Sequence, residues 1–196
     1  MDTPESLVYI AEGSFGLLDA GEIPAHTADW SNGFVATMQC GALIATGTHT
    51  GYVRVQAISQ HYRPDLSPAD ARWDEIVEVT VRAPHGKLSV ESLEQGPATG
   101  LPVLSSSGAG EYRVRVHAKG RADAFDQSHE EPVEAYLLQV WPTEGGQPTA
   151  IIRSSKQIER SLRTPAPPNP APAQNEGAKA RQEQLRQRLL RGGRSE

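Results

Sequence analysis

The sequence predicts an all-β domain, an antiparallel β-sandwich or jelly roll of about eight strands, followed by a Pro-rich linker and a C-terminal tail. Two runs carry this prediction. In residues 111–118, tyrosine and valine alternate with arginine and histidine, a period of two typical of a strand with one dry and one wet face. Residues 135–141 are almost wholly apolar, as in a central strand covered on both sides. Short runs between Gly- and Pro-containing turns supply the other strands.

The remaining strands follow from the same alternation. The opening run, residues 7–18, is interrupted at Gly13, where a bend or bulge is expected. Further strands are expected at residues 34–38, 42–46, 52–58, 75–82, 87–92 and 150–153. Neither the order of these strands nor the oligomeric state follows from the pattern.

Two of these strands are expected to pair with each other, because only a short turn separates residues 75–82 from residues 87–92. In the first of them the core-facing side chains are predicted to be Val77, Val79 and Val81, and the side chains expected to face water include Glu75 and Glu78. Residues 101–104 are expected to form an edge segment, since Pro102 donates no ladder hydrogen bond. In the loop at 60–73, Ser67-Pro68 is expected to start one helical turn.

The chain divides into four parts by composition. Residues 1–154 are predicted to form the β-sandwich domain and residues 155–163 a short helix. Residues 164–176 are rich in proline and are expected to be an extended spacer. Residues 177–196 form a basic tail that is expected to be disordered or transiently helical, since a helix of this length is marginal alone in water.

Charge is distributed unevenly along the chain, whose net charge is −5. Residues 1–154 contain 20 acidic and 10 basic residues, whereas residues 155–196 contain 4 acidic and 9 basic residues. An acidic body repels nucleic acid and attracts basic proteins. Direct nucleic-acid binding is therefore not expected for the body and remains open for the tail.

Other features of the composition favour a cytoplasmic protein. The single cysteine, Cys40, excludes an internal disulfide and fits a reducing compartment. No apolar run approaches the ~20 residues needed to cross a bilayer. The acidic first residues lack the basic and apolar regions of a signal peptide.

Signals for catalysis are weak, and we predict no catalytic residue, metal or cofactor. The sequence has no glycine-rich phosphate loop, nucleophile elbow or paired cysteines. Its six histidines are scattered. Four of them lie in predicted turns or loops, where a solvated imidazole needs no further explanation: His26, His49, His61 and His85. The alternative is a metal site made by His26 with Asp29, or by His129 with Glu130 and Glu131.

The loop between the two strongest strands is the candidate partner-binding site. Two adjacent strands joined by a long charged loop indicate a sandwich edge that presents this loop, residues 119–134. Its candidate contact residues are Asp123, Phe125, Asp126, Glu130, Glu131 and Glu134. Such a negative surface competes for a basic cleft, and an aromatic within it can act as an anchor. The alternatives are a solvated loop and a phenylalanine that folds under to plug the sandwich.

The basic face of the strand at 111–118 has a structural explanation. Arg113, Arg115 and His117 share one side of it and are expected to meet acidic groups on a neighbouring strand. A nucleic-acid surface would need more basic residues and no surrounding excess of acid.

A series of short segments resembles the competence protein J family, small bacterial proteins that inhibit the DNA-entry nuclease encoded beside them. These segments are residues 13–15, 29–30, 33–36, 41–44, 77–79, 86–92 and 110–114. The resemblance spans residues 7–141 and implies a β-sandwich that binds protein rather than catalysing a reaction. The loops at 60–73 and 119–134, the Pro-rich segment and the basic tail depart from the family pattern, so no binding residues are transferred.

Three functions are consistent with these observations. The first is a non-enzymatic, cytoplasmic protein, similar to a nuclease inhibitor or immunity protein, whose acidic body occludes a basic partner. The second is a sandwich that binds carbohydrate or a small ligand, or an enzyme on that scaffold, through aromatic residues in or beside loops: Trp30, Tyr52, Tyr62 and Trp73. The third is an assembly module that docks through the tail residues Arg181, Arg186, Arg188 and Arg191.

Overall fold

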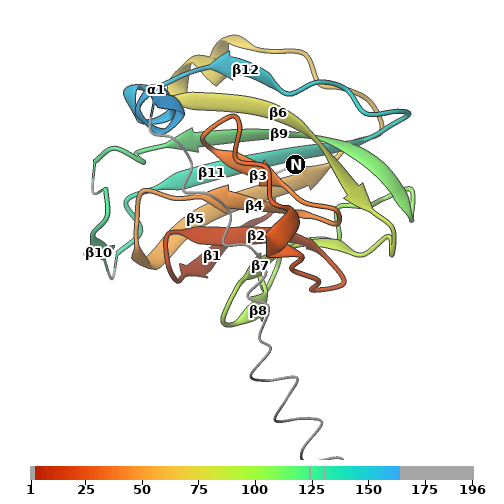
Figure 1. The fold of residues 1–196 in the computed structure, drawn as a ribbon, viewed down its shortest axis with the longest axis horizontal. Coiled ribbons are helices and arrows are strands. Elements are labelled where there is room, and N and C mark those ends of the chain that lie inside the picture. Colours follow the sequence, from red (N-terminus) through yellow and green to blue (C-terminus); the bar gives the residue numbers. More distant parts are fainter. Residues whose placement is uncertain (1–2, 124, 130, 164–196) are drawn as a thin grey trace, which may run out of the picture. The chain divides into compact units, whose positions relative to one another are not determined.

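The computed structural model describes residues 3–123, 125–129 and 131–163 of the chain, and these form two packed β-sheets (Figure 1). The twelve strands are β1 (Glu5–Ile10), β2 (Ser14–Asp19), β3 (Val35–Thr37), β4 (Ala42–Ala45), β5 (Thr50–Ser59), β6 (Glu75–Ala83), β7 (Leu88–Ser92), β8 (Gly96–Pro97), β9 (Gly110–Lys119), β10 (Ser128–His129), β11 (Ala135–Thr143) and β12 (Ala150–Arg153). Two 3₁₀ turns, η1 (Ala25–Thr27) and η2 (Pro68–Arg72), and the helix α1 (Lys156–Arg163) complete the described elements.

The predicted all-β sandwich is confirmed. One sheet has seven strands in the order β1-β5-β11-β9-β6-β12, with β10 paired to β5, and the other has five in the order β3-β4-β2-β7-β8. All pairings are antiparallel except those of β5 with β10 and β11, which are parallel. The strand count exceeds the expected eight in part because the opening run forms two strands, β1 and β2, and in part because β8 and β10 are two-residue pieces that leave no trace of alternation in the sequence.

The break expected at Gly13 moves the chain from one sheet to the other. Glu12 (φ 55°) and Gly13 (φ 72°) both lie in the left-handed region, between the bridged residues Ala11 and Ser14. Such a two-residue turn needs positive φ at both central positions. As a result β1 belongs to the large sheet and β2 to the small one.

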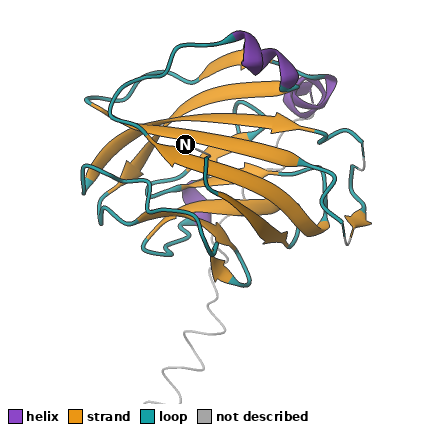
Figure 2. Ribbon diagram, turned by 180° about the vertical axis from the view of Figure 1, so that it is seen from behind, coloured by secondary structure: helices purple, strands orange, loops and turns teal. Residues whose placement is uncertain are grey.

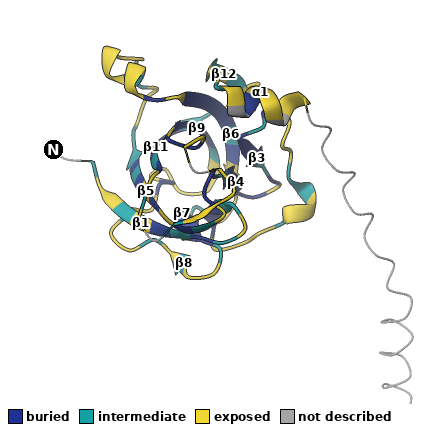
Figure 3. Ribbon diagram, turned by 90° about the vertical axis from the view of Figure 1, so that its left-hand side faces the viewer, coloured by how far each residue is buried: buried dark blue, intermediate teal, exposed yellow. Residues whose placement is uncertain are grey.

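The main core lies between the two sheets. It takes Val77, Val79 and Val81 from β6, as predicted, and alternate residues of β5, β9 and β11. Phe15 from the small sheet meets Tyr136 from the large one edge to face, with ring centroids 5.2 Å apart. In Figure 3, which is coloured by burial, buried stretches lie on strands of both sheets.

Two pairing predictions need correction. β7 does not pair with β6; it pairs with β2 and β8, because the turn after β6 carries the chain across to the small sheet. β9 and β11 are neighbours, as expected, but they occupy the middle of the large sheet rather than an edge. Residues 101–104 form no strand, although Leu104 is fully buried and its amide donates to the Leu88 carbonyl at 2.7 Å.

The predicted wet face of β9 is also buried. Arg113, Arg115 and His117 are at most 3% exposed, and Glu75 and Glu78 of β6, expected to face water, are at most 2% exposed. Side chains from residues 63–73 and the main chain of residues 147–148 contact this face. In the view from behind, where the large sheet faces the reader, chain segments cross over part of it (Figure 2).

The helix α1 completes the core at one end of the sandwich. Ile158 is fully buried and belongs to the main hydrophobic cluster, although it follows the last strand by five residues. Leu162, one turn later, is 48% exposed. The core therefore extends beyond residue 154.

We expect Ile158→Ala to lower the free energy of unfolding by about 2–4 kcal/mol, because it leaves a cavity in a packed core. Leu162→Ala on the same helix is the matched control and should change stability by less than about 0.5 kcal/mol. Urea titration followed by tryptophan fluorescence measures both changes. Equal effects of the two substitutions would contradict the role assigned to Ile158.

Candidate interaction surface

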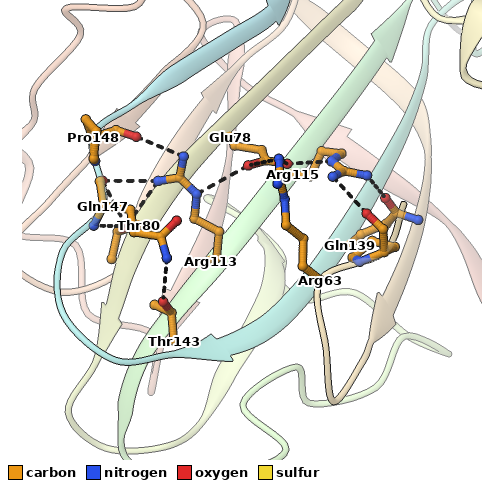
Figure 4. A network of polar contacts seen from close by, with 10 residues as sticks. Arg63, Glu78, Thr80, Arg113, Arg115, Gln139, Thr143, Gln147 and Pro148 are labelled. Atoms are coloured by element: carbon orange, nitrogen blue, oxygen red, sulfur yellow. Dashed lines mark hydrogen bonds and ion pairs between the residues drawn. The ribbon is translucent and has the colours of Figure 1, made fainter. Parts of the chain in front are cut away.

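The buried charges of the large sheet form a network centred on Glu78 (Figure 4). Glu78 Oε1 accepts a hydrogen bond from Arg115 Nε at 2.7 Å, and its Oε2 lies 3.5 Å from Arg113 Nε. Arg63, which is mostly exposed, reaches the same carboxylate at 3.3 Å. Burial raises the pKa of Glu78, but the hydrogen bonds and charges of Arg115 and Arg63 outweigh it and hold the pKa below its ordinary value.

The other donors of the two arginines bind main-chain carbonyls and the side chains of Thr80 and Gln139. Arg113 donates to the carbonyls of Gln147 (3.1 Å) and Pro148 (2.8 Å), and Arg115 donates to that of Pro64 (3.0 Å). The segments at 63–64 and 147–148 are thereby fixed against the sheet. Both arginines contact a carboxylate on the neighbouring strand, as expected, and their role is structural.

His117 is enclosed at the other end of β9. Its Nδ1 lies 3.1 Å from the Leu137 carbonyl, its Nε2 lies 3.3 Å from Asp70 Oδ1, and the ring of Trp73 packs beside it at 5.5 Å between centroids. Asp70 comes from η2, whose start at Ser67-Pro68 was predicted and which has a capping box between Ser67 and Asp70. Burial lowers the pKa of His117 below its ordinary value of 6.5 and outweighs the opposing effects of Leu137 and Asp70; the charge of Arg115 acts in the same direction as burial.

Glu134, one of the candidate contact residues, lies inside the protein and is 1% exposed. Its carboxylate accepts hydrogen bonds from the amides of Gly47 (3.0 Å) and Thr48, the Thr48 hydroxyl (2.6 Å) and the Tyr136 hydroxyl. Burial, together with the charge of Glu134, raises the pKa of Tyr136 well above its ordinary value, so the phenol keeps the proton it donates. Glu134 therefore ties the β4–β5 turn to β11 and offers no charge to a partner.

A second buried pair, Arg121 with Glu75, lies close enough to Tyr136 for both charges to affect that residue. Arg121 is 4% exposed, forms an ion pair with Glu75, and places its guanidinium 4.3 Å from the centroid of the Phe34 ring. Glu75 also accepts a hydrogen bond from the Ser155 hydroxyl, just before α1. The base of the loop at 119–134 is thus connected to β6 and to the start of the helix.

The other described candidate residues of this loop are exposed. Asp123, Asp126 and Glu131 face solvent, and Phe125 is 49% exposed. Glu130 lies outside the described residues, as do the tail residues Arg181, Arg186, Arg188 and Arg191. Phe125 therefore does not plug the sandwich.

The loop is anchored to the sheet at several points. The amide of Asp126 (φ 60°) donates to the Gly47 carbonyl at 2.8 Å, and the amide of His49 donates to the Gln127 carbonyl at 2.9 Å. At its base, the Gly120 amide donates to Asp74 Oδ2 at 2.9 Å. Asp74 is exposed and is not among the residues predicted for this site, because the residues next to it in sequence do not indicate that it adjoins Gly120. We call Asp74, Asp123, Asp126 and Glu131 the acidic rim.

Burial leaves the exterior acidic. Among the described residues up to 154, five of 18 acidic and three of 10 basic side chains are buried, so 13 acidic and seven basic side chains are not. The exposed lysine nearest the rim in sequence is Lys119, at the end of β9. The rim therefore consists of exposed carboxylates in or beside a loop that also exposes an aromatic residue, Phe125.

Other candidate sites of the sequence are not assembled in the described part of the chain. No group of three or more His, Cys, Asp or Glu residues there could hold a metal ion. Cys40 is buried, and burial together with Asp19 raises the pKa of its thiol to about 11. A hollow of about 460 Å³ lies at the end of the sandwich opposite the loop at 119–134. It is lined by Pro24, Gln39, Cys40, Arg82, Pro84, Gly110 and Glu111, so none of the four candidate aromatic residues lines it.

Comparison with known proteins finds distant likeness in structure alone. No family model and no curated protein matches the sequence. The fold resembles that of ComJ. That crystal structure, of an inhibitor of the DNA degrading activity of NucA from Bacillus subtilis, aligns with a TM-score of 0.44 and 13% identity over 71% of this chain and 95% of ComJ. A second structure, crocagin biosynthetic gene J, aligns with a TM-score of 0.43 and 16% identity over 74% of this chain and all of that one.

The resemblance to competence protein J inferred from the sequence is thus confirmed as a distant likeness of fold. Among the described helices, none has the length and apolar character needed to span a bilayer.

We expect Glu134→Gln to lower the free energy of unfolding by about 1–3 kcal/mol, because buried donors lose a carboxylate acceptor. Glu131→Gln, three residues away and exposed, is the control and should be close to neutral. Chemical denaturation compares the two. A neutral Glu134→Gln would contradict the role of this carboxylate in holding the β4–β5 turn.

Stability should also depend on His117. Since the folded pKa of His117 lies below the unfolded value near 6.5, the unfolded chain binds the proton more tightly. The free energy of unfolding should therefore fall as the pH drops from about 6.5 toward the lower folded pKa. In His117→Gln this fall should be smaller, whereas His61→Gln, which alters an exposed histidine, should retain it. Urea titrations at several pH values measure the slope, and an unchanged slope in His117→Gln would refute this assignment.

Proposed function

We propose that this chain is a non-enzymatic, cytoplasmic binding protein whose acidic rim docks on a basic face of another protein, with a nuclease as the partner to test first. The observation that supports this proposal is the difference between the two groups of charges. The buried ones bind one another and the main chain, whereas the rim carboxylates are exposed in or beside a loop that also exposes Phe125.

Anchoring makes the rim suitable for recognition. The hydrogen bonds of Gly120 to Asp74 and of Asp126 to Gly47 fix the loop at its base and near its middle, so less conformational entropy is lost when a partner binds. Exposed carboxylates steer association with a basic surface, and a neighbouring aromatic supplies the apolar contact at the centre.

A nuclease fits this chemistry because an enzyme that binds DNA presents cationic groups to the phosphates. An acidic protein surface competes for those groups. ComJ is described as an inhibitor of the DNA degrading activity of NucA, and the competence protein J resemblance seen in the sequence suggests the same kind of partner here. NucA and the nuclease encoded nearest to this chain are therefore the first probes.

The decisive variant reverses the charge of Asp123, Asp126, Glu130 and Glu131 to lysine. We expect its affinity for the partner nuclease to fall at least a hundredfold, about 2.7 kcal/mol, and protection of DNA from degradation to fall with it. The wild-type affinity should decrease as salt is raised, because rim charges act through screened electrostatics. Calorimetry and a DNA-degradation assay measure these effects.

The matched control reverses four exposed acidic residues outside the loop: Glu22, Asp65, Glu94 and Glu144. It makes the same change in net charge, so it should retain most of the affinity. A variant ending at residue 163 tests the tail separately and should bind like the full chain. The proposal fails if the loop variant binds as tightly as the control variant.

A further inference from the structure

Within the described residues, three of the four edge strands of the two sheets have features that prevent them from pairing with another chain. β12 has a register shift between Ile151 and Arg153, β8 has two residues of which one is Pro97, and β3 has three residues. The end of β3 is covered in addition, because the Asp29 amide donates to the Thr37 carbonyl at 2.9 Å. Bulges, proline, short length and covering segments are the usual means by which proteins prevent an edge from pairing with another chain.

β1 has none of these protections. Its six residues pair with β5 in unbroken register, and the sheet order gives it no neighbour on its other side. Leu7 is 53% exposed, and Tyr9 packs edge-on against Tyr52 with centroids 5.4 Å apart. In the view along the sheets, the start of β1 lies at the exposed margin of the large sheet (Figure 3).

The alternation of hydrogen bonds identifies which residues of β1 face outward. The Ala57 amide donates to the Pro4 carbonyl at 3.2 Å, so residue 4 and the even-numbered residues after it direct their main-chain groups toward β5. On the far side of β5, the Arg54 amide donates to the Glu134 carbonyl at 3.0 Å, which is the same alternation seen from the next strand. Glu5, Leu7 and Tyr9 therefore direct their N–H and C=O groups to the open edge.

We propose that this edge binds the β1 edge of a second copy of the chain, antiparallel and about a two-fold axis, so that the two large sheets become continuous. The outward N–H and C=O groups of the two β1 strands meet only when odd-numbered residues of one strand lie opposite odd-numbered residues of the other. The register with Leu7 opposite Leu7 uses all of them, since Glu5 then lies opposite Tyr9 on both sides. Each strand contributes three amides, which gives six hydrogen bonds across the axis.

This register is self-complementary in its side chains as well. The two exposed Leu7 side chains contact each other, and no like charges lie opposite. The Glu5 carboxylate is already compensated within its own sheet by Arg54 at 3.3 Å and Gln56 at 2.9 Å. Residues opposite in an antiparallel pair share a face, so Val8 stays on the core side. A symmetric contact of this kind closes after two copies and produces a dimer rather than a fibre.

The first test is the mass of the full chain in solution by light scattering over a dilution series. We expect a dimer of about twice the 21.2 kDa chain mass that dissociates on dilution. Leu7→Pro removes an outward amide without removing a β1–β5 hydrogen bond and should be monomeric. Leu66→Lys, at a leucine that is 50% exposed, is the matched control and should remain dimeric.

The second test fixes the register and does not depend on Leu7→Pro folding. Opposite residues of a hydrogen-bonded antiparallel pair have Cα atoms about 5.5 Å apart, which lies within the range that a disulfide spans. Leu7→Cys should form a disulfide-linked dimer under mild oxidation at low protein concentration, and Leu66→Cys should not. A wild-type chain that stays monomeric into the millimolar range, a Leu7→Pro chain that stays dimeric, or equal crosslinking of the two cysteine variants would each overturn the proposal.

Discussion

The closed outer face of the large sheet depends on one buried carboxylate, that of Glu78. Arg113 and Arg115 stand beside it on β9 and are almost fully buried. Taking such ions out of water costs several kcal/mol each unless close partners compensate for the lost hydration. Glu78 supplies the opposite charge, and three main-chain carbonyls and the side chains of Thr80 and Gln139 supply further acceptors. The buried charges of the sheet are therefore covered by the segments at 63–64 and 147–148, and the arginine hydrogen bonds hold these segments in place.

Acidic residues consequently have two different roles in this chain. Glu75 and Glu78 pair with buried arginines, and the Glu134 carboxylate accepts hydrogen bonds from buried amides and hydroxyls, so all three are satisfied inside the fold. Asp123, Asp126 and Glu131 lie in the same loop as Glu134, yet they remain in water. A single loop thus contributes both a buried carboxylate that stabilises the fold, Glu134, and a set of exposed carboxylates that are free to bind a partner.

The alternation of apolar and polar residues predicts where the strands lie, but it does not predict which of their faces other segments cover. The alternation in residues 111–118 correctly indicates a strand and separates its two faces. It cannot show that the basic face is covered, because the covering groups come from residues 63–73 and 147–148. The same limit applies to Glu134: its donors Gly47 and Thr48 are more than 80 residues away. Asp74 was overlooked for this reason too, since its place beside Gly120 follows from the pairing of β6 with β9.

The parallel pairing of β5 with β11 joins residues 54–59 to residues 135–140. The first strand to be synthesised in the centre of the large sheet therefore has no neighbour on that side until some 80 further residues have been added. Contacts between residues so far apart in sequence form slowly, and the β5–β11 pairing requires that residues 135–140 have been synthesised. At synthesis rates of about 5–20 residues per second, β5 waits several seconds for its partner, and chaperones that shield apolar strands have that interval in which to act.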